Sequence, residues 1–184
     1  MTSPQGGQAK TLYAIVDAAR DQRLYPLVMH ATEKACLFAG DIAEPLARAA
    51  PHLVNLRSNE QLFHAWRDTG RGQAWGVLCR SDLPLDALRR HLRRFLVAKL
   101  PDGMVVQFRF YDPRVFNAYL RECNAEELAR WFKGVSCYLV EDGQTGAMHE
   151  YNLRGGLLHD GDERLGLEPE GEVISVSKPS HKRR

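Results

Sequence analysis

Apolar runs of strand length alternate with helical patterns along most of this sequence. Runs rich in β-branched and aromatic residues predict strands; they are Thr11–Ala18, Lys34–Ala39, His52–Leu56, Ala74–Cys79, Val105–Tyr111 and Val135–Val140. Apolar residues at helical spacing predict helices; they cover Leu24–Thr32, Asn59–Asp68, Ser81–Lys99, the segment after Pro113 and Ala125–Phe132. This interleaving predicts an α/β domain, with α+β as the alternative, in which helices flank a mixed β-sheet.

Changes in composition predict the domain organisation. Residues 1–10 are rich in Gly and Gln and predict a flexible N-terminus, whereas residues 11–140 carry the patterns of one globular domain. Asp-Gly turn signals and weak strand patterns predict a less regular, hairpin-like extension of that domain over residues 141–167. Residues 168–184 alternate Glu, Pro, Gly and Ser and end in basic residues, which is typical of a disordered tail.

The segment from Val105 to Phe116 combines a strand, a turn and the start of a helix. Alternation along the strand predicts an apolar face with Val106, Phe108 and Phe110 and a polar face with Gln107, Arg109 and Tyr111. Asp112 is expected to cap the next helix, and Pro113 fits the first helical position, where no N–H is needed. The segment therefore predicts a rigid corner that presents charge at a defined place.

Composition argues against several functional classes. The 184 residues carry a formal net charge of +2, which is too small to favour nucleic-acid binding. No apolar run approaches the roughly 20 residues that span a bilayer, and the N-terminus lacks the basic and apolar regions of a signal peptide. The four cysteines stand far apart without a C-x-x-C pair, so we expect free thiols in a reducing cytosol and no zinc site.

Few residues are candidates for catalysis or metal binding. Residues 159–163 read His-Asp-Gly-Asp-Glu, but without EF-hand spacing, so an acidic hairpin turn is favoured over a cation site. Gly70-Arg71-Gly72 imitates a phosphate-binding loop but follows a helix, which favours a hinge. Asp17 ends the first strand and is interpreted as a cap or charge partner rather than a catalytic carboxylate. We therefore expect no enzymatic activity, no metal and no cofactor.

The predicted helix over Ser81–Lys99 is strongly basic. Its polar faces carry Arg89, Arg90, Arg93 and Arg94. A solvated face is the first interpretation, an acidic protein partner the second, and nucleic acid the last, because no aromatic residues interleave for base stacking. Arg90 and Arg93 are the candidate partner contacts on this helix.

The charged corner has two interpretations. In the structural one, an ion-pair network locks the strand to the helix; the residues of this motif are Asp17, Phe108, Phe110, Asp112 and Pro113. In the functional one, the corner is a binding hot spot, since Arg and Tyr are enriched in such sites; its candidate contacts are Arg109, Tyr111 and Arg114. The structural interpretation is favoured because a capping aspartate already has a full role.

The segment Phe108-Arg109-Phe110-Tyr111-Asp112-Pro113-Arg114-Val115 resembles the hallmark of a bacterial family called domain of unknown function 4123, the type VI secretion effector chaperones or adaptors. Further similarities follow in order; they are Tyr13–Ala19, Ala50–Val54, Trp75-Gly76, Ser81, His91–Arg93, Pro101–Gly103 and Trp131–Gly134. The resemblance runs from about Leu12 to Gly134. Leu37–Asp41 depart from the family pattern, and residues from Gly143 onward match no pattern.

The resemblance implies a cytoplasmic, non-enzymatic adaptor. Such a protein binds a cognate toxic effector and promotes its loading onto the VgrG spike protein, in some systems with a PAAR tip, and it has no nucleic-acid or membrane partner. The residues leave two alternatives open. One is an immunity protein that blocks a toxin, and the other is a small metal-dependent hydrolase that uses Asp17 and residues 159–163.

Overall fold

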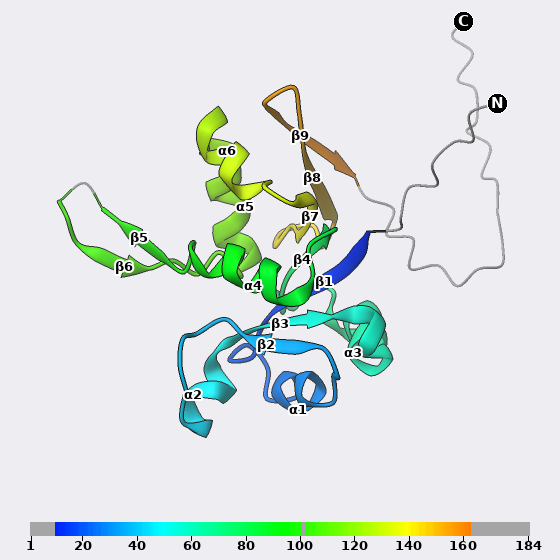
Figure 1. Cartoon of the computed structure of the whole chain (residues 1–184). Helices are drawn as coiled ribbons and strands as arrows, with labels where there is room; N and C mark the ends of the chain where they lie inside the picture. The colour runs from blue at the N-terminus through cyan, green and yellow to red at the C-terminus, as the bar shows by residue number, and fades with distance from the viewer. Residues whose placement is uncertain (1–9, 101, 163–184) are drawn as a thin grey trace, which may run out of the picture.

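The computed structural model describes residues 10–100 and 102–162 of the chain. Its main element is a seven-stranded sheet with the order β2-β3-β1-β4-β7-β8-β9 (Figure 1). Its strands are β1 (Thr11–Asp17), β2 (Lys34–Cys36), β3 (Pro51–Asn55), β4 (Gly76–Ser81), β7 (Val135–Glu141), β8 (Met148–Arg154) and β9 (Leu157–Asp162). A separate two-stranded sheet consists of β5 (Val97–Lys99) and β6 (Val105–Gln107).

Helices cover both faces of the seven-stranded sheet. Helices α1 and α3 pack on one face, and α4, α5 and α6 lie on the other (Figure 1). The helices are α1 (Leu24–Met29), α2 (Glu44–Ala49), α3 (Glu60–Ala65), α4 (Leu85–Arg93), α5 (Pro113–Glu122) and α6 (Ala125–Trp131), with a 3₁₀ turn η1 (Leu56–Ser58) and a π-helical turn η2 (Trp66–Gly70). No helix in the described ranges has both the length and the apolar character that crossing a bilayer requires.

Two hydrophobic cores lie on opposite faces of the sheet, and β1 contributes to both. Tyr13 and Ile15 belong to the core under α4, α5 and α6, whereas Ala14 and Val16 belong to the core under α1 and α3. Adjacent side chains of a strand point to opposite faces, so a strand buried on both faces is apolar at every position. This explains why residues 12–16 form a continuous apolar run instead of an alternating one.

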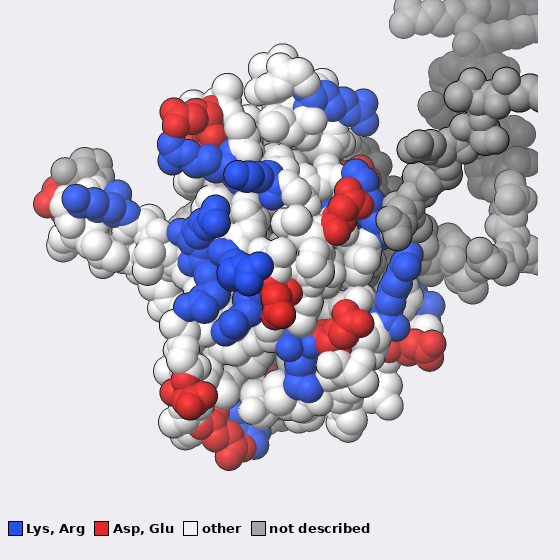
Figure 2. All heavy atoms as spheres, viewed as in Figure 1, with Lys and Arg blue, Asp and Glu red and all other residues white. Residues whose placement is uncertain are grey.

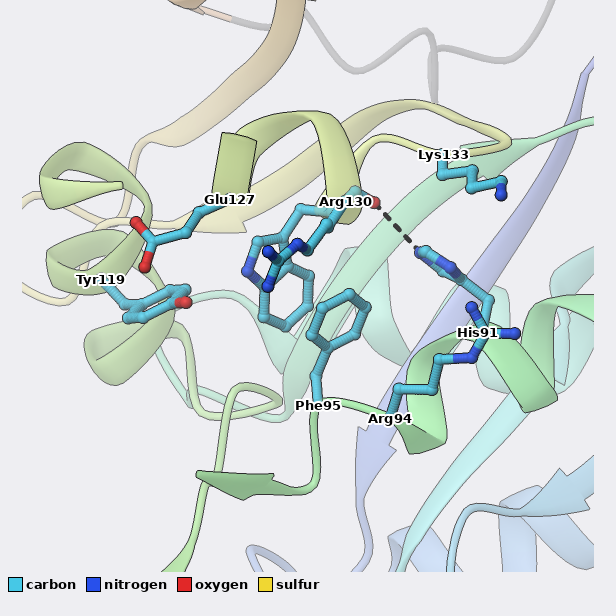
Figure 3. Close-up of a pocket in the computed structure, with 8 residues that line it drawn as sticks. His91, Arg94, Phe95, Tyr119, Glu127, Arg130 and Lys133 are labelled. Atoms are coloured by element: carbon cyan, nitrogen blue, oxygen red, sulfur yellow. Dashed lines mark hydrogen bonds between the residues drawn. The ribbon is translucent and has the colours of Figure 1, made fainter. Parts of the chain in front are cut away.

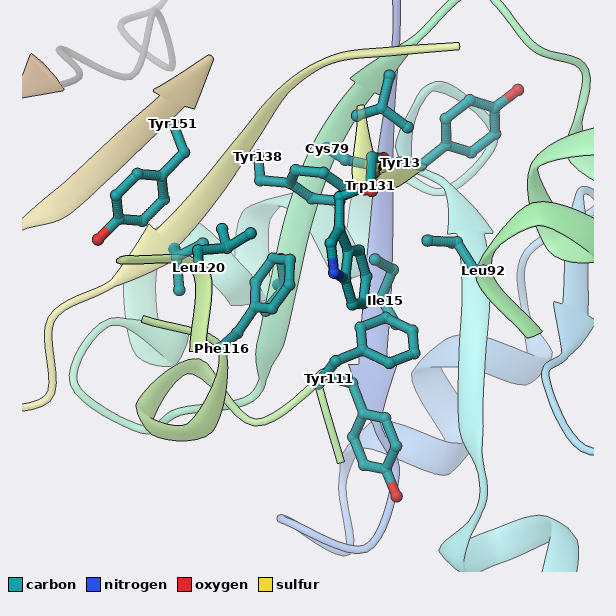
Figure 4. Packing of buried hydrophobic residues seen from close by; sticks show 14 of the residues in the cluster. Tyr13, Ile15, Cys79, Leu92, Tyr111, Phe116, Leu120, Trp131, Tyr138 and Tyr151 are labelled. Carbon is teal, nitrogen blue, oxygen red and sulfur yellow. Dashed lines mark hydrogen bonds between the residues drawn. The ribbon is translucent and has the colours of Figure 1, made fainter. Parts of the chain in front are cut away.

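Trp131 is the centre of the core under α4, α5 and α6 (Figure 4). Its ring stacks on Phe95 with centroids 3.7 Å apart, and Phe116 meets it edge-on at 4.9 Å. Its backbone carbonyl accepts hydrogen bonds from Tyr138 Oη at 2.9 Å and from the ring of His91 at 3.1 Å. One residue thus joins the end of α4, helices α5 and α6, and strand β7.

The fold class predicted from the sequence is confirmed, since helices flank a central sheet. All strand pairings of the described residues are antiparallel, so the sheet is not mixed in direction and the α+β alternative describes it better. Residues 148–162, expected to be less regular, form the paired strands β8 and β9 beside β7. The predicted tail at 168–184, residues 163–167 and the N-terminus before residue 10 lie outside the described residues.

Several predicted elements are shorter than expected, among them β2, which ends at Cys36 rather than Ala39. Helix α4 ends at Arg93 rather than near Lys99, and residues 97–99 turn into a strand. Strand β6 ends at Gln107 rather than Tyr111, because Phe110 and Tyr111 belong to the same core and consecutive strand residues cannot share one face. Helix α2 was not predicted, since none of its residues is buried and it has no apolar stripe.

Strands β5 and β6 form an arm that extends away from the body of the protein (Figure 1). The two strands pair only with each other among the described elements. Val97 and Val105 on the arm are 58% and 68% exposed. The arm therefore contributes little to either core.

Candidate partner-binding surface

The corner after β6 is built by a tight turn and a capped helix. The amide of Asp112 donates to the carbonyl of Arg109 at 2.9 Å, which closes the turn. Asp112 Oδ1 then accepts from the amide of Arg114 at 3.0 Å, and Pro113 occupies the first position of α5. Both the predicted cap and the predicted proline position are confirmed.

Arg109 is paired with a buried carboxylate on a distant strand. The guanidinium donates to Oδ2 of Asp17 at 2.8 Å, and the Asp17 side chain is 2% exposed whereas that of Arg109 is 51% exposed. The interpretation of Asp17 as a charge partner is therefore confirmed. A buried carboxylate needs such a partner because an uncompensated charge in the interior is costly. The pair fixes the corner to the end of β1.

Arg114 is held in the same manner by Asp112. Its Nε and NH2 atoms donate to the two carboxylate oxygens at 2.9 and 2.6 Å, and the side chains of Asp112 and Arg114 are 10% and 56% exposed. Burial alone raises the pKa of Asp112, but the hydrogen bonds from Arg114 outweigh it and keep this pKa below its ordinary value. The guanidinium is thus fixed in orientation while half of it faces solvent.

The buried ring of Tyr111 lies beside the guanidinium of Arg109. Tyr111 is only 3% exposed, and the guanidinium lies 5.6 Å from the centre of its ring. Burial raises the pKa of its hydroxyl, which lies 3.4 Å from the Gln107 amide. Tyr111 therefore orients Arg109 and offers little surface of its own. The corner is an internal ion-pair lock that also presents two half-exposed guanidinium groups.

The arginines of α4 face different surroundings. Arg89 donates to the backbone carbonyls of Cys36 at 2.7 Å and Phe38 at 3.3 Å, so it holds α4 to the segment after β2. Arg90 is exposed. Arg93 lines a hollow of about 400 Å³ at the base of the arm, together with Gln107. Gln107 also contacts Tyr111 of the corner, which links this hollow to the corner through one hydrogen bond.

The candidate metal and phosphate sites have structural partners. Within residues 10–100 and 102–162, no three His, Cys, Asp or Glu side chains are placed to hold a metal ion. Asp160 lies within β9 rather than in the predicted turn, and it contacts His149 on β8 at 2.8 Å and Arg121 on α5 at 3.2 Å. Glu163 lies outside the described residues. The loop at Gly72 donates its amide to the carboxylate of Glu141, so an internal anion already satisfies that amide.

Three of the four cysteines have thiols whose pKa is raised. Burial raises the pKa of Cys36 and Cys79 and raises that of Cys123 to about 11. A thiolate is the reactive form, and a raised pKa makes it scarce at neutral pH. No disulfide links the four cysteines.

A cleft between α4, α5 and α6 was not predicted from the sequence (Figure 3). It has a volume of about 400 Å³ and is lined by His91, Arg94, Phe95, Tyr119, Glu127, Arg130, Trp131 and Lys133. We call it the α4–α6 cleft. Burial lowers the pKa of His91, and the nearby charges of Arg94 and Lys133 lower it further, although its hydrogen bond to the Trp131 carbonyl acts in the opposite direction.

The cleft was missed because its residues come together only through helix packing. Arg94 belongs to the basic helix that the sequence singled out, but Arg130 and Lys133 lie 36 and 39 residues further along the chain. The sequence carries one local signal of the cleft. Two basic residues flank the Trp131-Phe132 pair at a helix end, a place where cations are common and where an aromatic pair also marks the core.

Comparison with known proteins gives one significant similarity. A family model described as "Domain of unknown function (DUF4123)" matches residues 12–130. The matched region runs from β1 to α6 and contains both the corner and most of the α4–α6 cleft. No curated protein and no solved structure matches the chain significantly.

Proposed function

The chain belongs to the DUF4123 family, a family of type VI secretion effector chaperones and adaptors, and we propose that it binds a cognate toxic effector and promotes its loading onto the VgrG spike protein. The family match over residues 12–130 is the observation that carries this proposal. We further propose that the protein acts in the cytoplasm, without enzymatic activity of its own, and that a PAAR tip joins some of these assemblies.

The corner supports a binding role for this domain. Protein interfaces depend on a few rigid anchors, among which arginine is enriched. Arg109 and Arg114 are half exposed, and each is fixed by a buried carboxylate, so little side-chain freedom is lost when a partner binds them. Arg90 and Arg93 on α4 are the further contacts that we propose.

The chemistry of the described residues is consistent with an adaptor. The carboxylate of Asp17, the candidate for hydrolytic chemistry, is committed to Arg109. The thiols of Cys36, Cys79 and Cys123 have raised pKa values, which disfavours a nucleophilic role. No observation favours the hydrolase or the immunity protein over the adaptor.

Co-expression with the effector encoded beside this chain tests the proposal. We expect a stable stoichiometric complex that survives purification and recruits VgrG. A failure to bind any neighbouring effector or spike protein would contradict the adaptor function. Protection of cells from the isolated toxin domain, without any effect on its delivery, would instead identify an immunity protein.

The variant Arg114→Ala distinguishes a role of Arg114 in effector binding from a role in stability. The Arg114 side chain is half exposed, and Asp112 keeps the hydrogen bond from the backbone amide, so we expect the free energy of unfolding to fall by about 1 kcal/mol. Effector affinity should fall by about tenfold, as for loss of one arginine anchor. Arg57→Ala, an exposed arginine outside the corner, is the matched control. Equal loss of stability and binding in Arg114→Ala would show a purely structural role.

A further inference from the structure

We propose that the α4–α6 cleft binds an acidic segment of the partner protein that carries an aromatic or large apolar anchor residue. This inference rests on the proposed adaptor function and adds the chemistry of the cargo segment to it. Two properties of the cleft lead to it. Its floor is aromatic and rigid, and its rim carries cations that the described acidic residues leave largely uncompensated.

The floor is formed by the edges of the aromatic core. Phe95 and Trp131 are stacked with an interplanar angle of 16°, and Tyr119 lies against Trp131 with ring centroids 5.8 Å apart. His91 fixes the backbone of Trp131 through its hydrogen bond of 3.1 Å (Figure 3). Phe95 and Tyr119 are partly buried, so each leaves part of its ring open toward the cleft. A rigid aromatic floor favours a flat or apolar anchor at low entropic cost.

The rim provides positive charge. Arg94 and Lys133 are exposed, and neither forms an ion pair with any acidic residue in the described part of the chain. Arg130 pairs with Glu126, but this is an exposed pair one helical turn apart, which a stronger partner can replace at little cost. Figure 2 shows Lys and Arg side chains gathered over α4 and toward α6.

The acidic residue that lines the cleft does not neutralise this rim. The carboxylate of Glu127 accepts a hydrogen bond from the Asn124 amide at 2.9 Å, as part of the capping box of α6. Glu127 is therefore engaged at the start of its own helix, on the Tyr119 side of the cleft (Figure 3). Even with Arg130 paired to Glu126, the charges of Arg94 and Lys133 have no acidic partner among the described residues, so the cleft is positive and complementary to an acidic ligand.

A protein segment fits these features better than a nucleic acid does. A nucleic acid needs a basic track along which several phosphates bind, and the chain has a net charge of only +2. Glu126 and Glu127 adjoin the cleft and would repel a continuous polyanion. A peptide can place separate carboxylates on Arg94, Arg130 and Lys133 and insert one apolar side chain between them.

Charge reversal of the rim tests the proposal in the full-length chain. The variant R94E/K133E alters two exposed side chains that have no structural ion pair, so it is expected to fold with the melting temperature of the wild type. Its affinity for the cognate effector should fall by about tenfold or more, and the wild-type affinity should weaken as salt rises from about 0.05 to about 0.5 M. The control R57E/R71E makes the same charge change at exposed arginines outside the cleft and should bind normally.

Overlapping peptides that cover the effector identify the segment. We expect binding of peptides that combine Asp or Glu with an aromatic or large aliphatic residue, and loss of that binding in R94E/K133E. Unchanged effector binding by R94E/K133E would overturn the proposed role of the cleft while leaving the adaptor function intact. Selection of neutral or basic peptides would overturn it as well.

A synthetic peptide of alternating Glu and Phe, labelled with a fluorophore, makes the test independent of the adaptor function. If the wild-type chain binds no effector, the proposed function fails, and this peptide then tests by itself whether the cleft binds an acidic segment. Salt-sensitive binding that is lost in R94E/K133E supports the proposal. Absence of binding, or equal binding by the variant, overturns it. Binding of a labelled single-stranded oligonucleotide in place of the peptide, lost in R94E/K133E, would assign the cleft to nucleic acid.

Discussion

Asp17 and Asp112 are buried carboxylates whose charges are met by arginines at the surface. This geometry makes the two members of each pair unequal. Removing an arginine leaves a buried carboxylate without its partner charge, whereas removing an aspartate also takes away a backbone hydrogen bond, from Ala19 just after β1 or from Arg114 at the start of α5. The aspartates are therefore the stabilising members, and the arginines are available for contact.

Replacement of Asp112 tests its capping role. Asp112→Ala removes the acceptor for the Arg114 amide at the start of α5, and we expect the free energy of unfolding to fall by about 1–2 kcal/mol. Asp112→Asn keeps that acceptor and is the matched control, because asparagine caps helices about as well as aspartate. Urea denaturation of both variants measures the difference. Equal stability of wild type and Asp112→Ala would contradict the capping role.

The two ion pairs differ in how far the sequence predicts them. Asp112, Pro113 and Arg114 are neighbours, and capping chemistry places them correctly without any knowledge of the fold. Arg109 and Asp17 are 92 positions apart, so their pairing depends on the path of the chain from β1 to the corner. The sequence favoured a cap or a charge partner as the role of Asp17, but only the fold shows that the partner is Arg109.

At the scale of elements, the packing of β1 against β4 depends on one glycine. A Cβ atom at Gly76 would lie 2.0 Å from the carbonyl oxygen of Ile15 on β1, and the Trp66 ring lies 3.2 Å away on the other side. Backbone atoms of a central strand cannot move aside without disturbing the pairing. The close approach of the two strands is therefore possible only with glycine at this position.

Gly76→Ala is accordingly expected to destabilise the protein by about 3 kcal/mol or more, the upper range for overpacking of a core. Gly161→Ala on β9 is the control, because the nearest atom to its added Cβ is 4.0 Å away. Thermal unfolding followed by circular dichroism compares the two variants. A similar melting temperature for both would show that β1 and β4 can separate without loss of stability.

The elements that periodicity predicted wrongly are those shaped by the aromatic core. Helix α4 ends before Phe95 because that side chain stacks on Trp131, and the Leu96 carbonyl then accepts from the Phe108 amide. Strand β6 stops early so that Phe110 and Tyr111 can both be buried. Apolar spacing along a chain shows which residues are buried, but it does not show that a turn brings neighbours into the same core.

For the whole molecule, the candidate binding surface is positioned by the aromatic core. Trp131 holds the helices that line the α4–α6 cleft, and Phe110, which follows Arg109 at the corner, packs edge-on against it at 5.2 Å. The corner and the cleft are therefore positioned by the same side chains. The sequence predicted the first from a contiguous motif and missed the second, whose parts come from α4, α5 and α6.

Two buried histidines make stability depend on pH across the whole molecule. The ring of His52 contacts the Ala47 carbonyl at 2.8 Å, and that of His91 contacts the Trp131 carbonyl at 3.1 Å. Burial lowers the pKa of both histidines below the value of about 6.5 that they have in the unfolded chain. As the pH falls below that value, the unfolded chain takes up protons that the folded chain does not. The stability that these groups contribute is therefore present above pH 6.5 and is lost toward their folded pKa values.

We expect the free energy of unfolding in urea to decrease from about pH 7.5 to about pH 5.5, and to decrease less in the double variant His52→Gln/His91→Gln. Glutamine retains a donor for each carbonyl but does not titrate, so the difference between the slopes isolates the two histidines. An unchanged slope in the double variant would mean that both rings take up protons as readily in the folded protein as in the unfolded chain. Their carbonyl contacts would then not depend on the neutral form, and the hydrogen bond that ties α4 to Trp131 would persist in the acid range.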